Sequence, residues 1–202
     1  AVTTSDAFLA QKIRELAVHG SPKRYAHNQI GYNSRLDTIQ AAILNVKLNS
    51  ISKWIASRKK VANNYLNLIK DNDFLFLPET NTKLTSHTWN QFVLRFKNDN
   101  FSIKDNPQNL FETNIEKYKS LRNFLKYHLL KKGINTIIYY PIPIHSQKAY
   151  QNSLYKREEL LETEKICTEV LSLPMFPEIT YEEQSYVVEN LNLIINDYLN
   201  II

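Results

Sequence analysis

Glycine, cysteine and long apolar runs are scarce in this 202-residue chain, and each scarcity excludes a class of protein. The 3 glycines are too few for the glycine-rich loops that cradle phosphates, and no nucleophile elbow occurs. The single cysteine, Cys167, excludes an internal disulfide framework and a zinc site built from several cysteines. A reducing compartment, by default the cytoplasm, is therefore the expected location.

Neither a membrane segment nor a nucleic-acid-binding surface is visible. No apolar stretch approaches the roughly 18 residues of a spanning helix, and no basic segment followed by an apolar one opens the chain. The net charge of +5 would suit a phosphate-bearing ligand, but no interleaved basic and aromatic run supports nucleic-acid binding. We therefore expect neither a membrane nor a nucleic acid as a partner. The 43% of hydrophobic residues is enough for a packed core.

The first segment predicts a short strand remnant followed by a helix. Residues 1–4 are β-prone, and Ser5 or Asp6 can cap a helix that runs to about Val18 and stops at Gly20. The chain opens without a methionine, which suggests a cut or a beginning that lies elsewhere.

A second, long helix is expected over residues 35–69. Apolar residues recur there at helical spacing, and no proline or glycine interrupts them. Ser34 and Asp37 resemble a capping box at its start, and a bend is expected near Asn49-Ser50. A helix of this length commonly bridges two parts of a structure.

Beyond residue 70 the pattern changes to that of a small α+β domain. The expected elements are strands over 74–78, 88–96 and 135–140, a loop over 97–113, and helices over 115–132, 157–170 and 180–199. Gly133 would end the first of these helices, and Thr180 with Glu183 would cap the last. We therefore expect a boundary near residue 70 with an α+β region beyond it.

The sequence GYNSRLDTIQAAIL at residues 31–44 places one of the few glycines, for an expected tight turn, just before the long helix. Asn33 and Arg35 stand ahead of the helix N-terminus, where unpaired backbone N–H groups and the helix dipole favour an anion. An amide and a guanidinium there would suit a phosphate. Alternatively, Asn33 only accepts irregular loop geometry and Arg35 pairs on the surface. From the residues alone, this simpler interpretation is favoured.

A second candidate site follows the strand expected over residues 135–140. The run YYPIPIH at 139–145 joins the strand end to two prolines and His145, which stiffens a loop and presents the histidine. Such loops often bind ligands, but prolines that only pack are at least as common. The stretch HTWNQF at 87–92 could form the edge of a site, although its alternation favours a strand.

Taken together, these segments resemble the DegT/DnrJ/EryC1/StrS family of pyridoxal-phosphate-dependent nucleotide-sugar aminotransferases. In the family's order, the matching motifs are AVTTSD at 1–6, HG at 19–20, RYAHNQIGYNSRLDTIQAAIL at 24–44, HTWNQFV at 87–93, YYPIPIH at 139–145, QKAY at 147–150, SLPMFPEIT at 172–180 and EEQ at 182–184. Several multi-residue matches in one order, over essentially the whole chain, are far more specific than any single motif.

The resemblance implies a fold between α/β and α+β, namely the C-terminal half of a fold-type-I aminotransferase. Residues 1–70 would be the tail of the large cofactor domain with its long linking helix, and residues 71–202 the small C-terminal α+β domain with a mainly antiparallel sheet. In the family, the Schiff-base lysine, the aromatic residue stacked on the cofactor and the acidic partner of the pyridine nitrogen lie upstream of the segment that AVTT ends. No catalytic residue is therefore assigned, and the lysine is expected upstream of Ala1.

The resemblance also implies binding residues. Asn33 would donate to the phosphate of pyridoxal 5'-phosphate, and Arg35 would lie beside phosphate or substrate, both at the neighbouring subunit's site in a homodimer. His145 matches the histidine of the family's PLH loop near the sugar, with Tyr139 and Tyr140 beside it. Where the family often reads TGIHYP this chain reads TIIYYP, a change that bears on substrate identity and binding.

The activity implied by the resemblance is transfer of an amino group from an amino acid such as glutamate to a keto sugar nucleotide, with the cofactor as electron sink. A chain without the lysine cannot do this unaided. We therefore expect a partial or split aminotransferase that needs a complementary N-terminal half. The alternative is a non-catalytic remnant, or a regulatory and dimerisation protein, derived from the same family.

Overall fold

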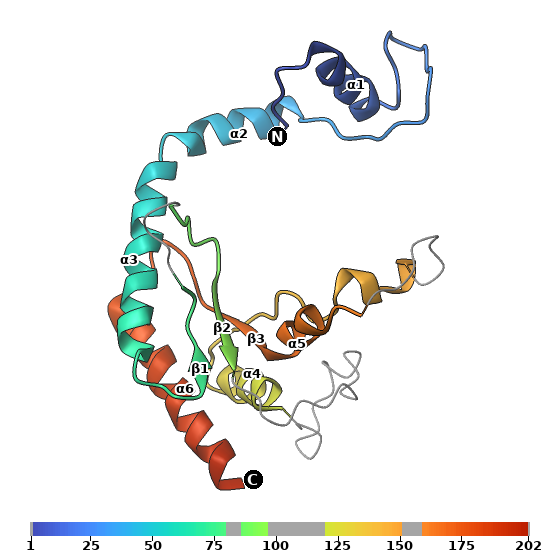
Figure 1. The fold of residues 1–202 in the computed structure, drawn as a ribbon. Helices are drawn as coiled ribbons and strands as arrows, with labels where there is room; N and C mark the ends of the chain where they lie inside the picture. Colours follow the sequence, from blue (N-terminus) through green and yellow to red (C-terminus); the bar gives the residue numbers. More distant parts are fainter. Residues whose placement is uncertain (1, 80–85, 97–119, 151–158, 202) are drawn as a thin grey trace. The chain divides into compact units, whose positions relative to one another are not determined.

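The structure, a computed structural model, describes residues 2–79, 86–96, 120–150 and 159–201 (Figure 1). The chain divides into two compact units, Ala1–Ile51 and Ser52–Ile202. In the described part of the chain, no helix combines the length and the hydropathy needed to cross a membrane.

The first unit opens with helix α1, Ala7–Ala17, in agreement with the sequence. Asp6 caps it, because its carboxylate accepts a hydrogen bond from the Leu9 N–H at 3.0 Å. The helix ends before Gly20, whose φ of 70° is the left-handed conformation that glycine adopts without strain.

Helix α2, Thr38–Leu48, begins later than the sequence predicts. Its N-cap is Asp37 rather than Ser34, and the Asp37 N–H donates to Gln40 Oε1 at 3.4 Å. Ser34 lies ahead of the helix, and its N–H donates to the Ala17 carbonyl at 2.9 Å. That bond keeps residues 33–34 in an extended conformation beside the end of α1.

The helix predicted over 35–69 is interrupted where the sequence suggested a bend. Helix α3, Ile51–Ile69, follows α2 after Asn49-Ser50. The Ser50 N–H donates to the Lys47 carbonyl at 3.0 Å, a tighter turn than that of an α-helix. From residue 52 onward α3 belongs to the second unit, and the domain boundary near residue 70 stays a prediction.

The sheet of the second unit is antiparallel, as predicted. Strands β1 (Leu75–Phe76), β2 (Phe92–Phe96) and β3 (Val170–Leu173) lie in the order β1-β2-β3 among the described residues (Figure 1). Phe92 pairs with Leu173 and Leu94 with Leu171 across β2 and β3. Because side chains alternate along a strand, these four residues share one face of the sheet, and all are buried.

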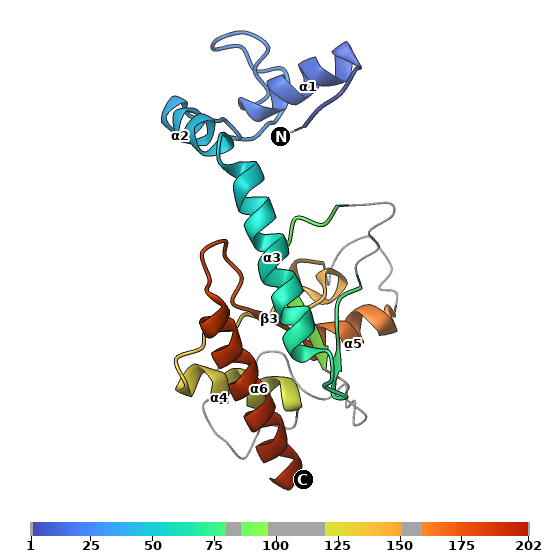
Figure 2. The ribbon, with the colours of Figure 1, turned by 90° about the vertical axis from the view of Figure 1, so that its left-hand side faces the viewer.

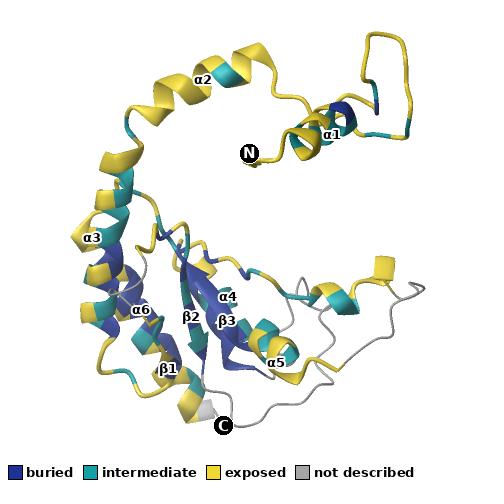
Figure 3. Cartoon of the chain, turned by 45° about the horizontal axis from the view of Figure 1, so that its top comes forward, coloured by how far each residue is buried: buried dark blue, intermediate teal, exposed yellow. Residues whose placement is uncertain are grey.

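Helices supply the remainder of this core. α4 (Leu121–Lys131) and α6 (Tyr181–Ile201) contact each other, and α3 and α6 lie side by side (Figure 2). Gln184 of α6, fully buried, donates to the Val61 carbonyl at 2.8 Å and accepts from Asn64 Nδ2 at 3.0 Å. Figure 3 shows the buried surface concentrated on the strands and on the facing sides of the second unit's helices.

Two predicted helix ends in this unit are confirmed. The Thr180 N–H donates to Glu183 Oε2 at 2.8 Å, and the Glu183 N–H donates to Thr180 Oγ1 at 3.1 Å, a complete capping box. Gly133 follows α4 with a φ of 77°, as a helix-ending glycine does.

The strand predictions are less accurate. The strand expected over 88–96 begins only at Phe92, since Trp89 has a φ of 54° and cannot continue an extended strand. The strand expected over 135–140 is reduced to an isolated bridge between Ile137 and Ser172. β3, in contrast, was not predicted as a strand. The loop expected over 97–113 lies outside the described residues, as do the predicted helical positions 115–119 and 157–158.

Candidate functional site

The segment after α4 brings two candidate tyrosines to a cavity. Along it, Ile134, Thr136 and Ile138 are buried, while Ile137 pairs with Ser172 of β3 by hydrogen bonds of 3.2 and 2.7 Å. This anchoring fixes the path of the chain immediately before residues 139–140. The short helices η3 (Ile144–Ser146) and η4 (Lys148–Tyr150) follow the two prolines.

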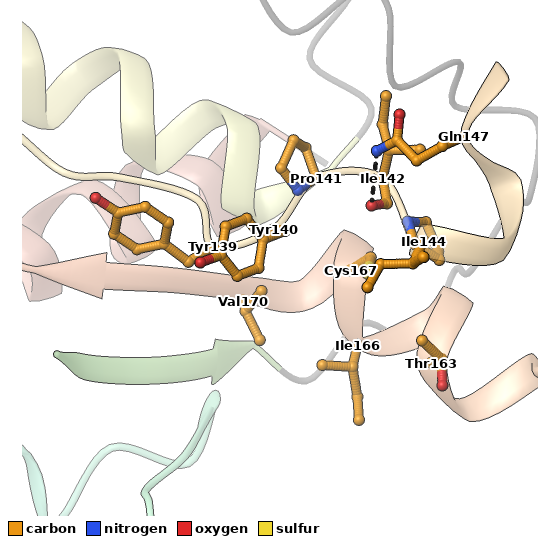
Figure 4. Close-up of a pocket in the computed structure, with 11 residues that line it drawn as sticks. Tyr139, Tyr140, Pro141, Ile142, Ile144, Gln147, Thr163, Ile166, Cys167 and Val170 are labelled. Carbon is orange, nitrogen blue, oxygen red and sulfur yellow. Dashed lines mark hydrogen bonds between the residues drawn. The ribbon is translucent and has the colours of Figure 1, made fainter. Parts of the chain in front are cut away.

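Tyr139 and Tyr140 line a cavity of about 470 Å³ between this segment and α5, Leu161–Glu169. Figure 4 shows Thr163 and Ile166 of α5 on one side and the proline-containing loop on the other. The lining is mainly apolar and comprises Tyr139, Tyr140, Pro141, Ile142, Pro143, Ile144, Gln147, Thr163, Ile166, Cys167 and Val170. A cavity of this size and character suits the apolar face of a small ligand.

Two polar side chains of this cavity have defined environments. Gln147 Nε2 donates to the Ile142 carbonyl at 3.4 Å, which helps to hold the loop closed (Figure 4). Burial raises the pKa of the Cys167 thiol, and nearby Glu164 acts in the same direction while Arg122 opposes it. At neutral pH Cys167 is therefore a thiol, and it lines the cavity as a small apolar group.

His145 does not line this cavity. It lies on η3 with its Nε2 2.9 Å from Glu164 Oε1 of α5, and their side chains are 17% and 20% exposed. The pair ties the loop to α5. Glu164 was not predicted as a site residue, because a separation of 19 positions from His145 leaves no local pattern in the sequence.

A second, more polar cavity of about 220 Å³ adjoins the first at Tyr139. Its lining comprises Asn90, Gln91, Asn135, Ile137, Tyr139, Ser172, Leu173, Pro174 and Met175. Tyr139 thus contributes to an apolar and to an amide-rich space. The sequence pointed to residues 87–92 only as a weak site edge, and Asn135 and Ser172 were missed.

Asn33 and Arg35 lie in the first unit. Both side chains are exposed. The Arg35 guanidinium is 3.9 Å from the Asp37 carboxylate, and with side chains 63% and 67% exposed this ion pair is weak. An anion of higher charge could therefore displace Asp37 from Arg35.

Gly31 has a spatial role in this segment. A Cβ there would lie 2.1 Å from the Gly20 backbone nitrogen, so only glycine allows the two chain segments to cross. Close approach, rather than the expected tight turn, thus accounts for Gly31. Hydrogen bonds from His19 N–H to the Tyr32 carbonyl (2.9 Å) and from Tyr32 N–H to the Leu16 carbonyl (2.7 Å) secure the crossing. The crossing holds the backbone that carries Asn33 against the end of α1.

Comparison with known proteins supports the resemblance seen in the sequence. A model of the DegT/DnrJ/EryC1/StrS aminotransferase family matches residues 1–192. Two curated relatives are each 38% identical over 192 residues: a pleiotropic regulatory protein of Geobacillus stearothermophilus and a dTDP-3-amino-3,6-dideoxy-alpha-D-galactopyranose transaminase of Aneurinibacillus thermoaerophilus. These alignments cover 94% and 95% of this chain but only 45% and 46% of the relatives.

A solved structure, NtdA of Bacillus subtilis with bound cofactor PMP, aligns with a TM-score of 0.70 at 27% identity. The alignment covers 96% of this chain and 41% of that one. The chain therefore spans about half the length, or less, of the proteins it matches. The expected fold, the C-terminal half of such an aminotransferase, is confirmed.

Proposed function

The chain belongs to the DegT/DnrJ/EryC1/StrS aminotransferase family, and we propose that it forms the C-terminal part of a pyridoxal-phosphate-dependent sugar aminotransferase. The proposed reaction moves an amino group from an amino acid such as glutamate to a keto sugar nucleotide. The observation that carries this proposal is the match at 38% identity, over 192 residues, to a dTDP-amino-sugar transaminase.

The residues of the first unit fit the phosphate of the cofactor. Asn33 offers amide N–H donors and Arg35 a guanidinium, and both are exposed beside the N-terminus of α2. The only group opposing an anion in the described contacts of Arg35 is the weakly paired Asp37. When bound, the cofactor supplies an electron sink for the transfer, while Asn33 and Arg35 hold its phosphate.

Tyr139, Tyr140 and His145 are proposed to contact the substrate. The apolar cavity beside the tyrosines suits the less polar face of a sugar, and the amide-rich cavity suits its hydroxyl groups. Because Glu164 holds Nε2 of His145, a substrate would meet this histidine through Nδ1. In this arrangement Glu164 orients the ring and the ring orients the substrate.

Because its relatives are about twice as long, the chain is proposed to act together with a complementary N-terminal half. The homodimer that the family resemblance implies is part of the same proposal. The test is to mix the full chain with a polypeptide that supplies that half and to add pyridoxal 5'-phosphate. We expect a cofactor absorbance band and amination of a keto sugar nucleotide that depends on glutamate. A folded complex without the band would contradict the proposal.

Asn33 can be tested in the same mixture. Because loss of its amide removes donors to the phosphate, Asn33→Ala should weaken cofactor retention, measured as the band that survives dialysis. Asn45→Ala, on the exposed surface of α2, is the matched control and should retain the cofactor. Unchanged retention in Asn33→Ala would refute the proposed role.

A regulatory role is the second candidate, because a relative at 38% identity is described as a pleiotropic regulatory protein. In that case the chain would keep the family fold for association without catalysis. A complex that forms but shows neither the cofactor band nor glutamate-dependent amination would favour it.

A further inference from the structure

Ser172 of β3 carries a buried hydroxyl that is not used by the fold. The residue is 5% exposed, and in the described part of the chain its Oγ forms no hydrogen bond. Its backbone is satisfied, because the N–H and the carbonyl both bond to Ile137. Burial of a hydroxyl without a hydrogen bond is unfavourable, so Ser172 Oγ is a candidate contact for a bound molecule.

The hydroxyl faces the amide-rich cavity of about 220 Å³ rather than the core. Because side chains alternate along β3, Ser172 points away from the face on which Leu171 is buried. The cavity is also lined by three carboxamide side chains, those of Asn90, Gln91 and Asn135. Each carboxamide offers both a donor and an acceptor, and the hydroxyl can act as either.

Helix α3 holds the walls of this cavity in place. Nη1 of Arg58 donates to the Asn90 carbonyl at 3.1 Å and to the Met175 carbonyl at 3.2 Å. The Tyr65 hydroxyl donates to the Pro174 carbonyl at 3.1 Å. These three carbonyls belong to residues that line the cavity, so its shape is fixed before any ligand arrives, which lowers the cost of binding.

The size and the charge of the cavity limit the group that it can hold. Pockets that enclose a whole small molecule begin at roughly 300 Å³, so this one suits a substituent of a larger ligand. None of the described residues that line it is charged, and a phosphate or a carboxylate would therefore be buried without a counter-charge. The expected group is neutral and polar.

The lining also contains the apolar residues Leu173, Pro174 and Met175. A hydroxyl group alone would leave these side chains without an apolar partner, and a methyl group alone would leave Ser172 unpaired. An acetamido group provides a carbonyl oxygen, an N–H and a methyl group, and thus matches the hydroxyl, the carboxamides and the apolar residues at once.

We propose that the amide-rich cavity binds the acetamido substituent of an amino sugar, with Ser172 Oγ donating to its carbonyl oxygen. Tyr139 lines both cavities, so the sugar ring would lie beside it, with the acetamido group on the Ser172 side. The inference rests on the proposed function and narrows its substrate class to keto sugar nucleotides that carry an acetamido group.

Met175 provides the measurement, because it is the single methionine of the chain and lines the cavity. The full 202-residue chain, labelled with carbon-13 at the methionine methyl group, gives one such NMR signal. It is titrated with the methyl glycoside of N-acetylglucosamine and with methyl glucoside, which has a hydroxyl in place of the acetamido group. We expect a saturable shift with the first sugar and about fivefold weaker binding of the second.

The proposal is overturned if the acetamido sugar leaves the Met175 signal unchanged, or if both sugars bind equally. Glutamine is the third probe, because an amino donor with a side-chain carboxamide shares part of the acetamido chemistry. A shift with glutamine but not with the acetamido sugar would assign the cavity to an amino donor, and would also overturn the proposal.

Ser172→Ala separates binding from folding. Since the hydroxyl has no partner in the described fold, the midpoint of urea unfolding should stay the same or rise, while affinity for the acetamido sugar should fall about fivefold. Ser5→Ala, at an exposed position of the first unit, is the matched control and should change neither value. A lower midpoint for Ser172→Ala would show that Oγ stabilises the fold itself, and unchanged affinity would show that it does not contact the sugar. Either result contradicts the proposal.

The titration needs neither cofactor nor amination, so its failure is distinct from failure of the proposed function. Binding of the acetamido sugar without any amination in the mixture of the two halves supports this inference and contradicts the catalytic proposal. Amination with equal kcat/KM for keto sugar nucleotides with and without the acetamido group does the reverse.

Discussion

His145 and Glu164 join a loop to a helix through a contact of 2.9 Å between Nε2 and Oε1, with both side chains about four-fifths buried. An ionised carboxylate only accepts hydrogen bonds, so Nε2 must carry the proton. In the neutral ring, Nδ1 is therefore the nitrogen that can accept a hydrogen bond.

We expect the neutral ring of His145 to be the Nε2–H tautomer, detected by nitrogen-15 NMR of the imidazole. In Glu164→Ala the Nδ1–H tautomer should become populated, and stability should fall by about 1 kcal/mol for the lost hydrogen bond. Glu162→Ala, on the same helix with its side chain 81% exposed, should leave the His145 signals unchanged. A wild-type ring protonated mainly on Nδ1 would contradict this assignment.

The ion pair between Arg95 of β2 and Glu169 should respond unequally to loss of either partner. The Glu169 side chain is 1% exposed, whereas that of Arg95 is 31% exposed and also lies over Phe76. Arg95→Met leaves a carboxylate buried without its cation and should cost about 3 kcal/mol, since unpaired buried charges are strongly destabilising. Glu169→Gln leaves a cation that can reach water and should cost about 1 kcal/mol.

Urea unfolding measures both values. Glu162→Gln serves as the control. The Glu162 side chain is 81% exposed and its carboxylate lies 4.0 Å from Arg95 Nη2, so this ion pair is weak and its loss should change stability little. Equal losses for Arg95→Met and Glu169→Gln would show that the burial of Glu169 does not determine the energetics.

Gly31→Ala should open the crossing at the end of α1. A Cβ at 2.1 Å from the Gly20 nitrogen cannot be accommodated, so the segment must separate. The amides of His19, Tyr32 and Ser34, now hydrogen-bonded across the crossing, should exchange faster with solvent.

Gly133→Ala provides the comparison. Gly133 has a φ of 77° but no atom within 4 Å of an added Cβ, so only the left-handed strain of about 1 kcal/mol applies. Its effect should be a small global loss of stability with no change in exchange at residues 19–34. Protection of those amides in Gly31→Ala equal to that in the wild type would disprove the steric argument.

His128 predicts a pH dependence of folding. Burial lowers its pKa from the ordinary value of 6.5, with Asp197 opposing, and the ring lies 4.1 Å from that of Phe124. Because the unfolded chain binds the proton more readily, the stability linked to His128 is complete above about pH 6.5 and is lost as pH falls toward the folded-state pKa. Urea unfolding of the wild type and of His128→Gln, at pH 5 and pH 7, should show a smaller acid-induced loss in the variant. An identical loss would exclude His128 as its source.

Features coded by neighbouring residues were predictable from the sequence. The cap of α1 at Asp6, the capping box of Thr180 and Glu183, and the end of α4 at Gly133 each depend on a few adjacent positions. The start of α2 was not predicted correctly, because the sequence favoured Ser34 as the cap and the structure has Asp37. The hydrogen bond from the Ser34 N–H to the Ala17 carbonyl joins this segment to the end of α1, a contact that the spacing of residues along α2 does not encode.

Features that depend on distant residues were not predictable. β3 is a strand because it pairs with β2, although its four residues follow directly on a helix and show no alternation, being buried on both faces. The contact between His145 and Glu164 likewise exists only once α5 packs against the loop. In the candidate site, the tyrosine-containing loop was therefore located from sequence, whereas the residues that oppose it across the cavity were not.

The crossing of Gly20 and Gly31 also makes residues 21–30 a closed loop, fastened at its base by the hydrogen bonds of Leu16, His19 and Tyr32. Within it, Lys23 and Ala26 pair in a local bridge, and residues 22–28 are exposed. Because the base carries the fastening, the length and composition of the loop can vary without displacing Asn33. A peptide tag or a fluorophore placed at residues 24–25 would therefore report on this part of the molecule while leaving the segment that carries Asn33 in place.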